Sequence, residues 1–289
     1  MVKYLLKYKK FFLSFFFVVF IFSFLFFIFY DLPSPESLKN YKVIPFSTHI
    51  LDRNGKLLFE IFREQNRTPV KLKNLPAYVA QATIAIEDKD FYKHSGISIF
   101  GGIFRAVKDM VLTGKLQGGS TITQQLVKSS LLTPQRTLRR KIREIILALW
   151  TERIFTKEEI LELYLNQVPY GGAAYGIEEA ARKYFNKKAV NLNLEEAALL
   201  AGLPQAPSLY SPFNNPQLAK KRRNEVLKAM YQQKYIDKKT FEQAIKKELK
   251  VAPPTTMIKA PHFVFYVKQQ LEEKYGIKTV EEGGLKVTT

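Results

Sequence analysis

Residues 137–165 read TLRRKIREIILALWTERIFTKEEILELYL, and this stretch decides the fold class. An apolar stripe with helical spacing runs along its first half, formed by Leu138, Ile142, Ile145 and Leu149. Residues 156–159, TKEE, form a capping box, which predicts that a second helix begins there and runs through Leu165. Two helices in direct succession predict a mainly α domain.

A small β element is predicted ahead of these helices. Residues 47–62 read STHILDRNGKLLFEIF, with two β-prone runs around Asn54–Gly55. Asn-Gly between apolar runs is a strong hairpin signal. From Pro76 onward the pattern is helical, and proline suits the first position of a helix. The predicted fold is therefore mainly α with a small N-terminal β hairpin.

An uncharged apolar run occupies residues 11–30 and contains 11 of the 23 Phe. A helix of this length spans about 30 Å, the hydrocarbon thickness of a bilayer. Lys3, Lys7, Lys9 and Lys10 precede the run, which predicts a cytoplasmic N-terminus and an exported remainder. A cleaved signal peptide is the alternative, but the run is too long and residues 30–33, YDLP, offer no small-residue cleavage site. We expect one uncleaved transmembrane helix.

Composition excludes several classes of protein. The chain has 289 residues, 46% of them hydrophobic, and a net charge of +19, so it is not a disordered chain. It has no cysteine, which excludes disulfide scaffolds, thiolate nucleophiles and cysteine-ligated zinc. A basic exported surface needs an anionic partner such as lipid headgroups, an anionic polymer or a phosphorylated substrate. Nucleic acid fits the charge equally well, but an outward-facing domain would rarely meet it.

These signals divide the chain into five parts. We expect a cytoplasmic tail at 1–10, a transmembrane anchor at 11–30, a linker at 31–46, the main domain at 47–250 and a second linker at 251–289. Within the main domain, residues 96–112 read GISIFGGIFRAVKDMVL, which is apolar yet contains three glycines. A buried core helix and an interfacial segment that dips into the bilayer explain this stretch equally well.

The candidate chemistry is acid–base work by carboxylates. The three histidines lack metal-site spacing, and the GxSxG, GxxxxGK and Ser-x-x-Lys motifs are all absent. Residues 85–96, AIEDKDFYKHSG, place Glu87 and Asp88 in the last turn of an apolar helix. Small neighbours there would raise the pKa of Glu87 towards that of a useful base. The alternative is a solvated helix end, which the residue types alone favour.

Three further polar stretches follow. Residues 118–128, GGSTITQQLVK, offer hydroxyl and amide groups for sugar or phosphate oxygens, or form a helix start capped by Ser120. Residues 136–144, RTLRRKIRE, surround Glu144 with five basic residues, either as structural ion pairs or to organise a pyrophosphate, with or without a divalent metal. Residues 160–185 place Glu162 and Asn166 one helical turn apart before a Gly-rich turn, as core packing or as a substrate wall.

These four stretches, together with RRNEVL at 222–227, resemble in order the five motifs of family 51 glycosyltransferases. That family comprises the peptidoglycan polymerase domains of class A penicillin-binding proteins and of monofunctional transglycosylases. The resemblance covers residues 47–235, and residues 260–289 resemble the link into a transpeptidase domain. It implies a lysozyme-like α fold and an inverting polymerisation of lipid II into β-1,4 glycan with release of undecaprenyl diphosphate.

The resemblance also implies roles for individual residues. Glu87 matches the base that takes the proton from the acceptor 4-hydroxyl. Glu144 matches a second carboxylate that assists at the diphosphate leaving group, directly or through a divalent cation (Mg or Mn). The matching substrate-binding positions are Ser120, Thr121, Gln124, Gln125, Lys128, Arg136, Arg140, Lys141 and Asn166. The matching structural positions are Asp88, His94 and Gly96, with His94 assigned to holding the loop. Asn186 stands where the family usually has glycine, and asparagine tolerates a left-handed backbone.

Partners and location follow from the same resemblance. The expected partners are lipid II, the growing glycan strand, the bilayer, moenomycin-type inhibitors and cell-wall synthesis proteins, without nucleic acid. The expected location is the bacterial inner membrane, with the domain on its outer face. The nearest rival is a membrane-anchored lytic transglycosylase or glycan hydrolase, which needs no cations for a diphosphate. A non-enzymatic basic scaffold is the rival from another class.

Overall fold

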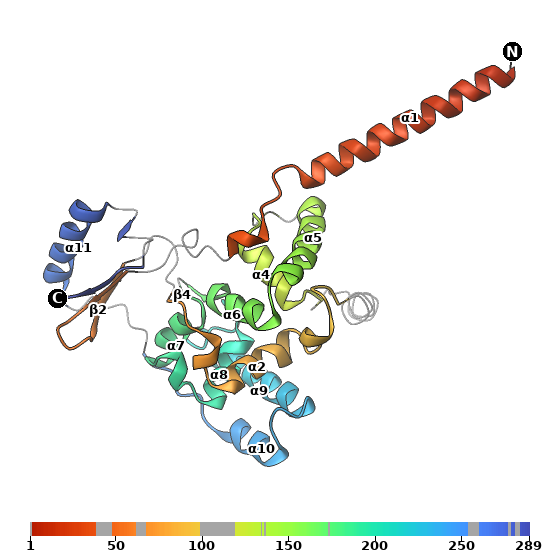
Figure 1. Ribbon diagram of the computed structural model, residues 1–289. Helices are drawn as coiled ribbons and strands as arrows, with labels where there is room; N and C mark the ends of the chain where they lie inside the picture. Colours follow the sequence, from red (N-terminus) through yellow and green to blue (C-terminus); the bar gives the residue numbers. More distant parts are fainter. Residues whose placement is uncertain are drawn as a thin grey trace.

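The computed structural model of the chain describes residues 2–38, 48–61, 68–98, 119–133, 135, 137–172, 174–253, 260–276, 279–280 and 284–289. It shows a mainly helical body with one long helix, α1 (Val2–Phe29), extending away from it (Figure 1). The mainly α prediction with a small hairpin is thereby confirmed. Arg136 and nearly all of the apolar stretch at 96–112 lie outside the described residues.

Helix α1 carries the predicted apolar span. Within it, Phe11–Phe29 has a mean hydropathy of 2.9, and among the described residues it is the one helix long and apolar enough to cross a membrane. The region after it differs from the expected linker at 31–46. The short helix η1 (Pro35–Leu38) buries Leu38 in the main core, so the first residues after the anchor are packed on the domain.

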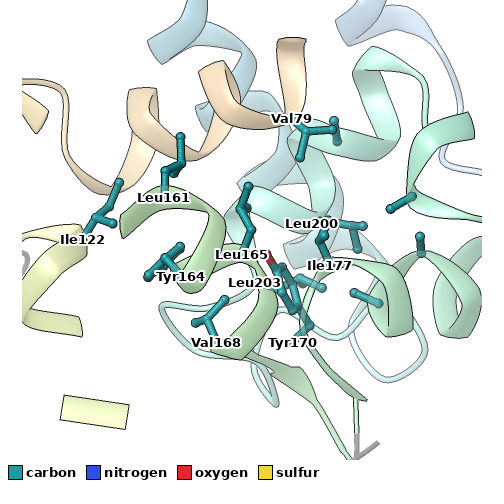
Figure 2. Close-up of a cluster of buried hydrophobic side chains, with 14 of the residues drawn as sticks. Val79, Ile122, Leu161, Tyr164, Leu165, Val168, Tyr170, Ile177, Leu200 and Leu203 are labelled. Carbon is teal, nitrogen blue, oxygen red and sulfur yellow. The ribbon is translucent and has the colours of Figure 1, made fainter. Parts of the chain in front are cut away.

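The helices of the body pack around a main apolar core (Figure 2). Their bounds are α2 (Ala77–Glu87), α4 (Ile122–Ser130), α5 (Leu138–Ile154), α6 (Lys157–Gln167), α7 (Ile177–Phe185), α8 (Leu194–Gly202), α9 (Pro216–Gln232) and α10 (Lys238–Lys246), with short helices η3 (Leu72–Asn74), η4 (Phe91–Lys93) and η6 (Ala189–Asn191). Helices α2, α8 and α9 pack on one another, and α4 packs on α5 and α6. A second apolar cluster lies between α2, α8, α9 and α10, and a third between α4 and α5. The C-terminal end of α2 lies beside the N-terminal end of α4, where the Asp88 carboxylate accepts from the backbone N–H of Ile122.

Local signals place several helix ends as predicted. Thr156 caps α6 through the expected capping box with Glu159. Pro76 is the N-cap of α2, one position earlier than predicted. Asn186 ends α7 with φ 53° and ψ 39°, so this asparagine does take the left-handed conformation.

The predicted hairpin is present and belongs to a separate small unit. Strands β1 (Thr48–Leu51) and β2 (Leu57–Ile61) pair antiparallel, with Ile50 opposite Phe59. Strand β5 (Lys286–Thr288) pairs parallel to β1, giving the order β2-β1-β5. Helix α11 (Pro261–Tyr275) adds Val264 to a core that also holds Ile50 and Val280. The described residues from 260 onward are therefore not the linker that we expected at 251–289. Their helix and strand cover the hairpin, because an isolated two-stranded hairpin cannot bury its apolar face alone.

Helix α5 carries its apolar stripe away from its most buried face. Leu138 is 79% exposed and Leu149 40%, while Ile142 and Ile145 are half-buried. The buried face instead holds Glu144, Leu147, Ala148 and Thr151. The apolar stripe of α5 therefore points away from the core of the domain.

Candidate active site

Glu87 is the last residue of α2, and its carboxylate is held on one side only. Its Oε2 accepts a hydrogen bond from Gln125 Nε2 of α4 at 2.7 Å. Its Oε1 is buried and has no hydrogen-bond partner among the residues that the structure describes. The residue as a whole is partly exposed, so the free oxygen lies just beneath an accessible surface.

The surroundings of Glu87 shift its acidity. Burial raises the pKa of Glu87, while the hydrogen bond from Gln125 and the positive charges of Arg222 and Lys128 act in the opposite direction. The net shift is upward, which favours a carboxylate that can accept a proton. The core tyrosines Tyr164 and Tyr170 lie within the electrostatic reach of the Glu87 carboxylate, which adds to the burial that raises their own pKa values.

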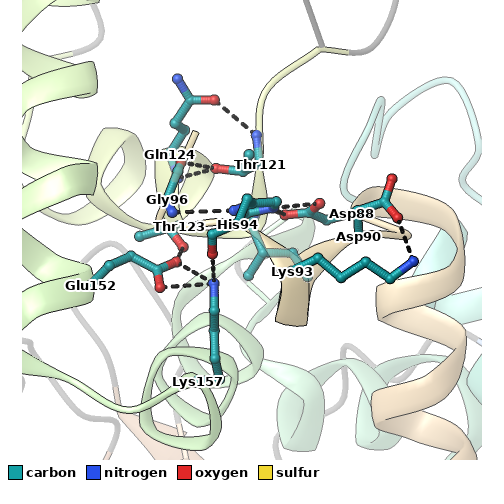
Figure 3. Close-up of polar contacts among 11 residues, drawn as sticks. Asp88, Asp90, Lys93, His94, Gly96, Thr121, Thr123, Gln124, Glu152 and Lys157 are labelled. Atoms are coloured by element: carbon teal, nitrogen blue, oxygen red, sulfur yellow. Dashed lines mark hydrogen bonds and ion pairs between the residues drawn. The ribbon is translucent and has the colours of Figure 1, made fainter. Parts of the chain in front are cut away.

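Asp88 joins the loop after α2 to the beginning of α4 (Figure 3). Its carboxylate accepts from the backbone N–H of Ile122 at 3.0 Å, in the first turn of α4. It also lies 2.9 Å from His94 Nε2, while His94 Nδ1 accepts from the Gly96 N–H at 3.2 Å. These contacts assign the proton to Nε2 of a neutral imidazole, which places His94 in holding the loop.

Thr121 and Gln124 stabilise the start of α4. They form a reciprocal capping box, and Thr121 Oγ1 also donates to the carbonyl of Gly96 at 2.6 Å. The predicted cap at Ser120 is therefore wrong by one residue. Gly96 has φ +87°, and a Cβ there would lie 2.8 Å from the carbonyl oxygen of Ala148, so only glycine fits. The Thr121 hydroxyl and the Gln124 Oε1, both expected to line the substrate site, are thus engaged within the protein.

A partly buried ion pair supports the same loop, and the sequence reasoning missed it. Lys157 Nζ donates to the carbonyl of His94 at 2.6 Å and pairs with Glu152 at 2.8 Å (Figure 3). Glu152 also accepts from Thr123 Oγ1 at 2.5 Å. Lys157 directly follows the Thr156 cap, and Glu152 stands two turns after Glu144 on α5. Neither residue lies in the four polar stretches from which the candidate chemistry was predicted.

Glu144 has the opposite environment from Glu87. It is buried to 1% exposure on α5 and is paired with Lys141, while Arg140 Nη1 lies 3.8 Å from its Oε2. Lys141 Nζ also donates to Ser120 Oγ at 3.3 Å. Arg140 Nε is buried without a partner in the described part of the chain. This cluster leaves guanidinium and ammonium donors for an anion next to the Glu144 carboxylate.

The structure divides the predicted substrate-binding residues. Lys128 is exposed near the end of α4, and its charge reaches Glu87. Asn166 is corrected to a structural residue: its side chain exchanges hydrogen bonds of 2.8 and 2.9 Å with the backbone of Val70 and also donates to the carbonyl of Glu162. All its polar atoms are thus used to hold the extended segment before η3. It has no donor left to offer a substrate.

Arg222 is a site residue that the sequence reasoning did not single out. It comes from the fifth motif, on α9, and donates to the carbonyl of Gly202 at 3.2 Å and to Glu225 at 3.0 Å. A Cβ at residue 202 would lie 2.8 Å from Arg222 Cγ, so Gly202 makes room for the side chain. Among the cations, its charge has the largest effect on Glu87. No local sequence pattern indicates this role of Arg222, because its contact with Gly202 joins two different helices, α8 and α9.

Comparisons with known proteins agree with this geometry. The model of the family described as Transglycosylase matches residues 54–231, which hold all the site residues above. The chain belongs to the transglycosylase family. Penicillin-binding protein 1A of Aquifex aeolicus is 41% identical over 262 residues, covering 91% of this chain and 36% of that protein. The protein of the same name from Escherichia coli is 40% identical over 257 residues, covering 88% and 30%.

The chain spans about a third of the length of these curated relatives. A crystal structure of penicillin-binding protein 1A from Haemophilus influenzae superposes with a TM-score of 0.49 and 27% identity, covering 85% of this chain and 27% of that one. The transglycosylase match lies within the predicted main domain at 47–250, and it includes the hairpin strand β2 from Leu57 onward.

Proposed function

We propose that this transglycosylase domain polymerises lipid II into β-1,4 glycan by inverting transfer, releasing the undecaprenyl diphosphate carrier. The observation that carries the proposal is the Glu87 carboxylate, with one oxygen oriented by Gln125 and the other buried and free. A carboxylate with a raised pKa beside an accessible surface suits removal of a proton from a sugar hydroxyl. The attack on the anomeric carbon of the donor then expels the diphosphate.

The cations supply what the leaving group needs. Lys128 and Arg222 surround the base, and Arg140 and Lys141 surround Glu144, so both clusters are suited to oxygen anions. A hydrolase that cleaves preformed glycan expels a sugar hydroxyl and has no use for such groups. This difference favours the polymerase over the lytic transglycosylase or glycan hydrolase. Arg136 stays a predicted member of the set.

The residues around Glu144 do not fit a resident divalent cation. Mg²⁺ and Mn²⁺ are held by oxygen ligands, usually carboxylates, whereas the groups nearest Glu144 are an ammonium and a guanidinium. No group of three or more His, Asp or Glu that could hold a metal occurs in the described ranges. We therefore assign the charge at the leaving group to Arg140 and Lys141. Activity that persists in EDTA would support this assignment.

The remaining parts of the proposal concern location and partners. The four lysines before the apolar run favour a cytoplasmic N-terminus in the bacterial inner membrane, with the domain on the outer face. The partners are then lipid II, the growing strand, the bilayer and other cell-wall synthesis proteins. Moenomycin-type inhibitors should compete for the cation-lined site.

Labelled lipid II and labelled preformed glycan, each incubated with the full chain in detergent, test the proposal. We expect polymer from lipid II, no release of fragments from glycan, and loss of polymer when a moenomycin-type inhibitor is added. The Glu158→Gln variant, altered at an exposed acid on α6, is the matched control for Glu87→Gln. Cleavage of preformed glycan without polymer would establish the hydrolase instead.

A further inference from the structure

The end of α1 is fastened to α5 by two arginines. Arg139 Nε donates to the carbonyl of Phe27 at 2.8 Å, and Arg143 Nε donates to that of Ile28 at 2.8 Å. Both guanidinium groups also donate to the carbonyl of Tyr30. Arg139 and Arg143 are one turn apart on α5, so they act from one face of that helix.

These contacts complete the hydrogen bonding of the helix end. The last four carbonyls of a helix have no partner within it. In α1, backbone N–H groups of Tyr30 and Leu32 satisfy the carbonyls of Phe26 and Phe29, and the arginines satisfy the two between them. An unpaired backbone carbonyl is costly in free energy where lipid excludes water, so the hydrogen bonds from the two arginines, called the clamp below, stabilise the end of α1.

Packing accompanies the clamp. Ile28 is 2% exposed, although its neighbours Phe27 and Phe29 are more than half exposed. Leu32 packs beside Leu147 and Ala148 of the buried face of α5. The anchor is thus seated on the domain through its last turn and the residues directly after it.

The apolar stripe of α5 lies on the side away from its buried face. It consists of the exposed Leu138 and Leu149 with the half-buried Ile142 and Ile145 between them, whereas the buried face holds Glu144, Leu147, Ala148 and Thr151. With 100° between successive residues, the two faces are well over a right angle apart, and the two clamp arginines lie between them. Trp150, on the side of the arginines, is 40% exposed. An apolar stripe beside arginines and an exposed tryptophan is the pattern of a helix that lies in a membrane interface.

We propose that α5 is the membrane-mounted helix of this domain: Arg139 and Arg143 clamp it to the end of α1, and its Leu138–Leu149 stripe rests on the bilayer. The lipid surface is the occupant because α1 leaves the hydrocarbon within a few residues of the clamp, so α5 begins at the headgroup layer. Glu144, on the face turned towards the core, is then held at a fixed height above the membrane. The basic stretch at 136–144 thus has two roles. Arg140 and Lys141 lie at Glu144, whereas Arg139 and Arg143 bind the end of the anchor.

Spin labels test the mounting without any assay of activity. The chain has no cysteine, so Leu138→Cys and Leu149→Cys can each be labelled alone in the full chain, reconstituted in vesicles of phosphatidylethanolamine and phosphatidylglycerol. We expect both labels to be accessible to oxygen dissolved in lipid and protected from a water-soluble nickel chelate. Lys228→Cys, exposed on α9, is the control and should show the reverse. Labels at 138 and 149 as water-accessible as the control would overturn the proposal, and so would labels protected from both reagents, which indicate a protein partner.

The clamp is tested by repeating the measurement with Arg139→Gln and Arg143→Gln. Each charge-assisted bond lost should lower the ratio of docked to undocked α5 roughly tenfold, so the labels should gain mobility and water access. Arg153→Gln, exposed near the end of the same helix, is the matched control. If the double variant misfolds, the single variants Arg139→Gln and Arg143→Gln test the clamp instead, because each removes only the hydrogen bonds of one arginine. Immersion that is unchanged in the double variant would overturn the clamp.

The consequence for turnover rests on the proposed function. Turnover of membrane-embedded lipid II should fall in the double variant, while turnover of a short-chain soluble analogue should not. An enzyme inactive on both substrates, with its labels still immersed, would count against the proposed function and leave the mounting intact.

Discussion

Two glutamates in this domain have opposite environments, and the difference sets what each can do. Glu87 keeps one oxygen free and has a raised pKa, whereas the Glu144 carboxylate is paired with Lys141 and lies 3.8 Å from Arg140. The residue types alone favoured a solvated helix end for Glu87. Its surroundings come from distant parts of the chain: α2 packs on α8 and α9, and Gln125 of α4 donates to the carboxylate.

Replacing Glu87 by Gln should abolish turnover without harming the fold. The rate of polymerisation should fall by about 10²–10⁴-fold, with binding of lipid II largely kept. Because the folded-state pKa is raised above the unfolded value, the wild type loses stability as pH rises through that window, and glutamine does not. The melting temperature of the variant should therefore equal or exceed that of the wild type at pH 7 and match it at pH 4. More than a tenth of the wild-type rate would remove Glu87 from the role of base.

Replacing Gln125 by Leu should move the acid limb of the pH–rate profile. The hydrogen bond from Gln125 lowers the pKa of Glu87, so its loss raises that pKa further and leaves less of the ionised base at a given pH. The acid limb should shift to higher pH, with a smaller effect well above it. Ser129→Ala, whose hydroxyl bonds only to a backbone carbonyl, is the control. A profile of unchanged position and reduced height would show that Gln125 acts elsewhere.

At the scale of elements, the loop from Asp88 to Gly96 is held at both sides. Asp88 fastens it to α4, and Lys157 at the start of α6 fastens it through the carbonyl of His94. The loop follows Glu87 directly, so its position affects where the Glu87 carboxylate points. The geometry of the candidate site therefore depends on the meeting of three helix ends.

Lys157→Met should loosen this loop and destabilise the domain. The pair is partly buried, so removing one partner should cost about 1–3 kcal/mol, between the values for exposed and for fully buried pairs, because the charge of Glu152 is left without a cation. The kcat should fall while KM changes little, and Glu152→Gln added to Lys157→Met should recover stability but only part of kcat. Lys93→Met, at an exposed pair with Asp90, should change stability by less than about 1 kcal/mol. Thermal unfolding and steady-state kinetics measure both effects. Full recovery of kcat in the double variant would reduce the pair to a structural role.

Elements were predictable from the sequence where the signal was local. The Asn54–Gly55 turn, the Thr156 capping box and the left-handed Asn186 each depend on a few neighbouring residues. Asn166 was misread because its partner is the backbone of Val70, 96 residues away. The α5 stripe was predicted from helical periodicity, which reports an apolar face without saying whether protein or lipid covers it. The partner of Asn166 is a tertiary contact, which no local pattern contains.

Over the whole molecule, α1 extends from one side of the body, and α11 with the hairpin lies on another (Figure 1). The anchor and α5 together determine which face of the body is turned to the membrane. The apolar stretch at 96–112, which is mostly outside the described residues, lies between the first two motifs in sequence. Its role as core helix or interfacial segment stays a prediction.

Residues 31–289, made without the anchor, should still bind lipid vesicles. The apolar contribution should resist salt, while that of nearby Lys and Arg is screened. Replacing Phe100 and Phe104 together by Ser should lower vesicle sedimentation and turnover of membrane-embedded lipid II, with little change in melting temperature. A core helix would instead lose several kcal/mol of stability, since each buried Phe contributes on the order of 3 kcal/mol. A large drop in melting temperature with vesicle binding intact would establish the core helix.

The pairing of β1 with β5 has a consequence for the order in which the protein is made. His49 of the inner strand β1 pairs with Lys286 of β5. More than two hundred further residues must therefore leave the ribosome before β5 can cover the second edge of β1. Closing so long a loop is slow, and an uncovered edge strand is a template for pairing with other chains. Until then β1 and β2 can form at most a marginally stable two-stranded hairpin, with one edge of β1 open. Protection of that edge, by a holding chaperone or by neighbouring residues, is a requirement of biogenesis that the finished fold no longer displays.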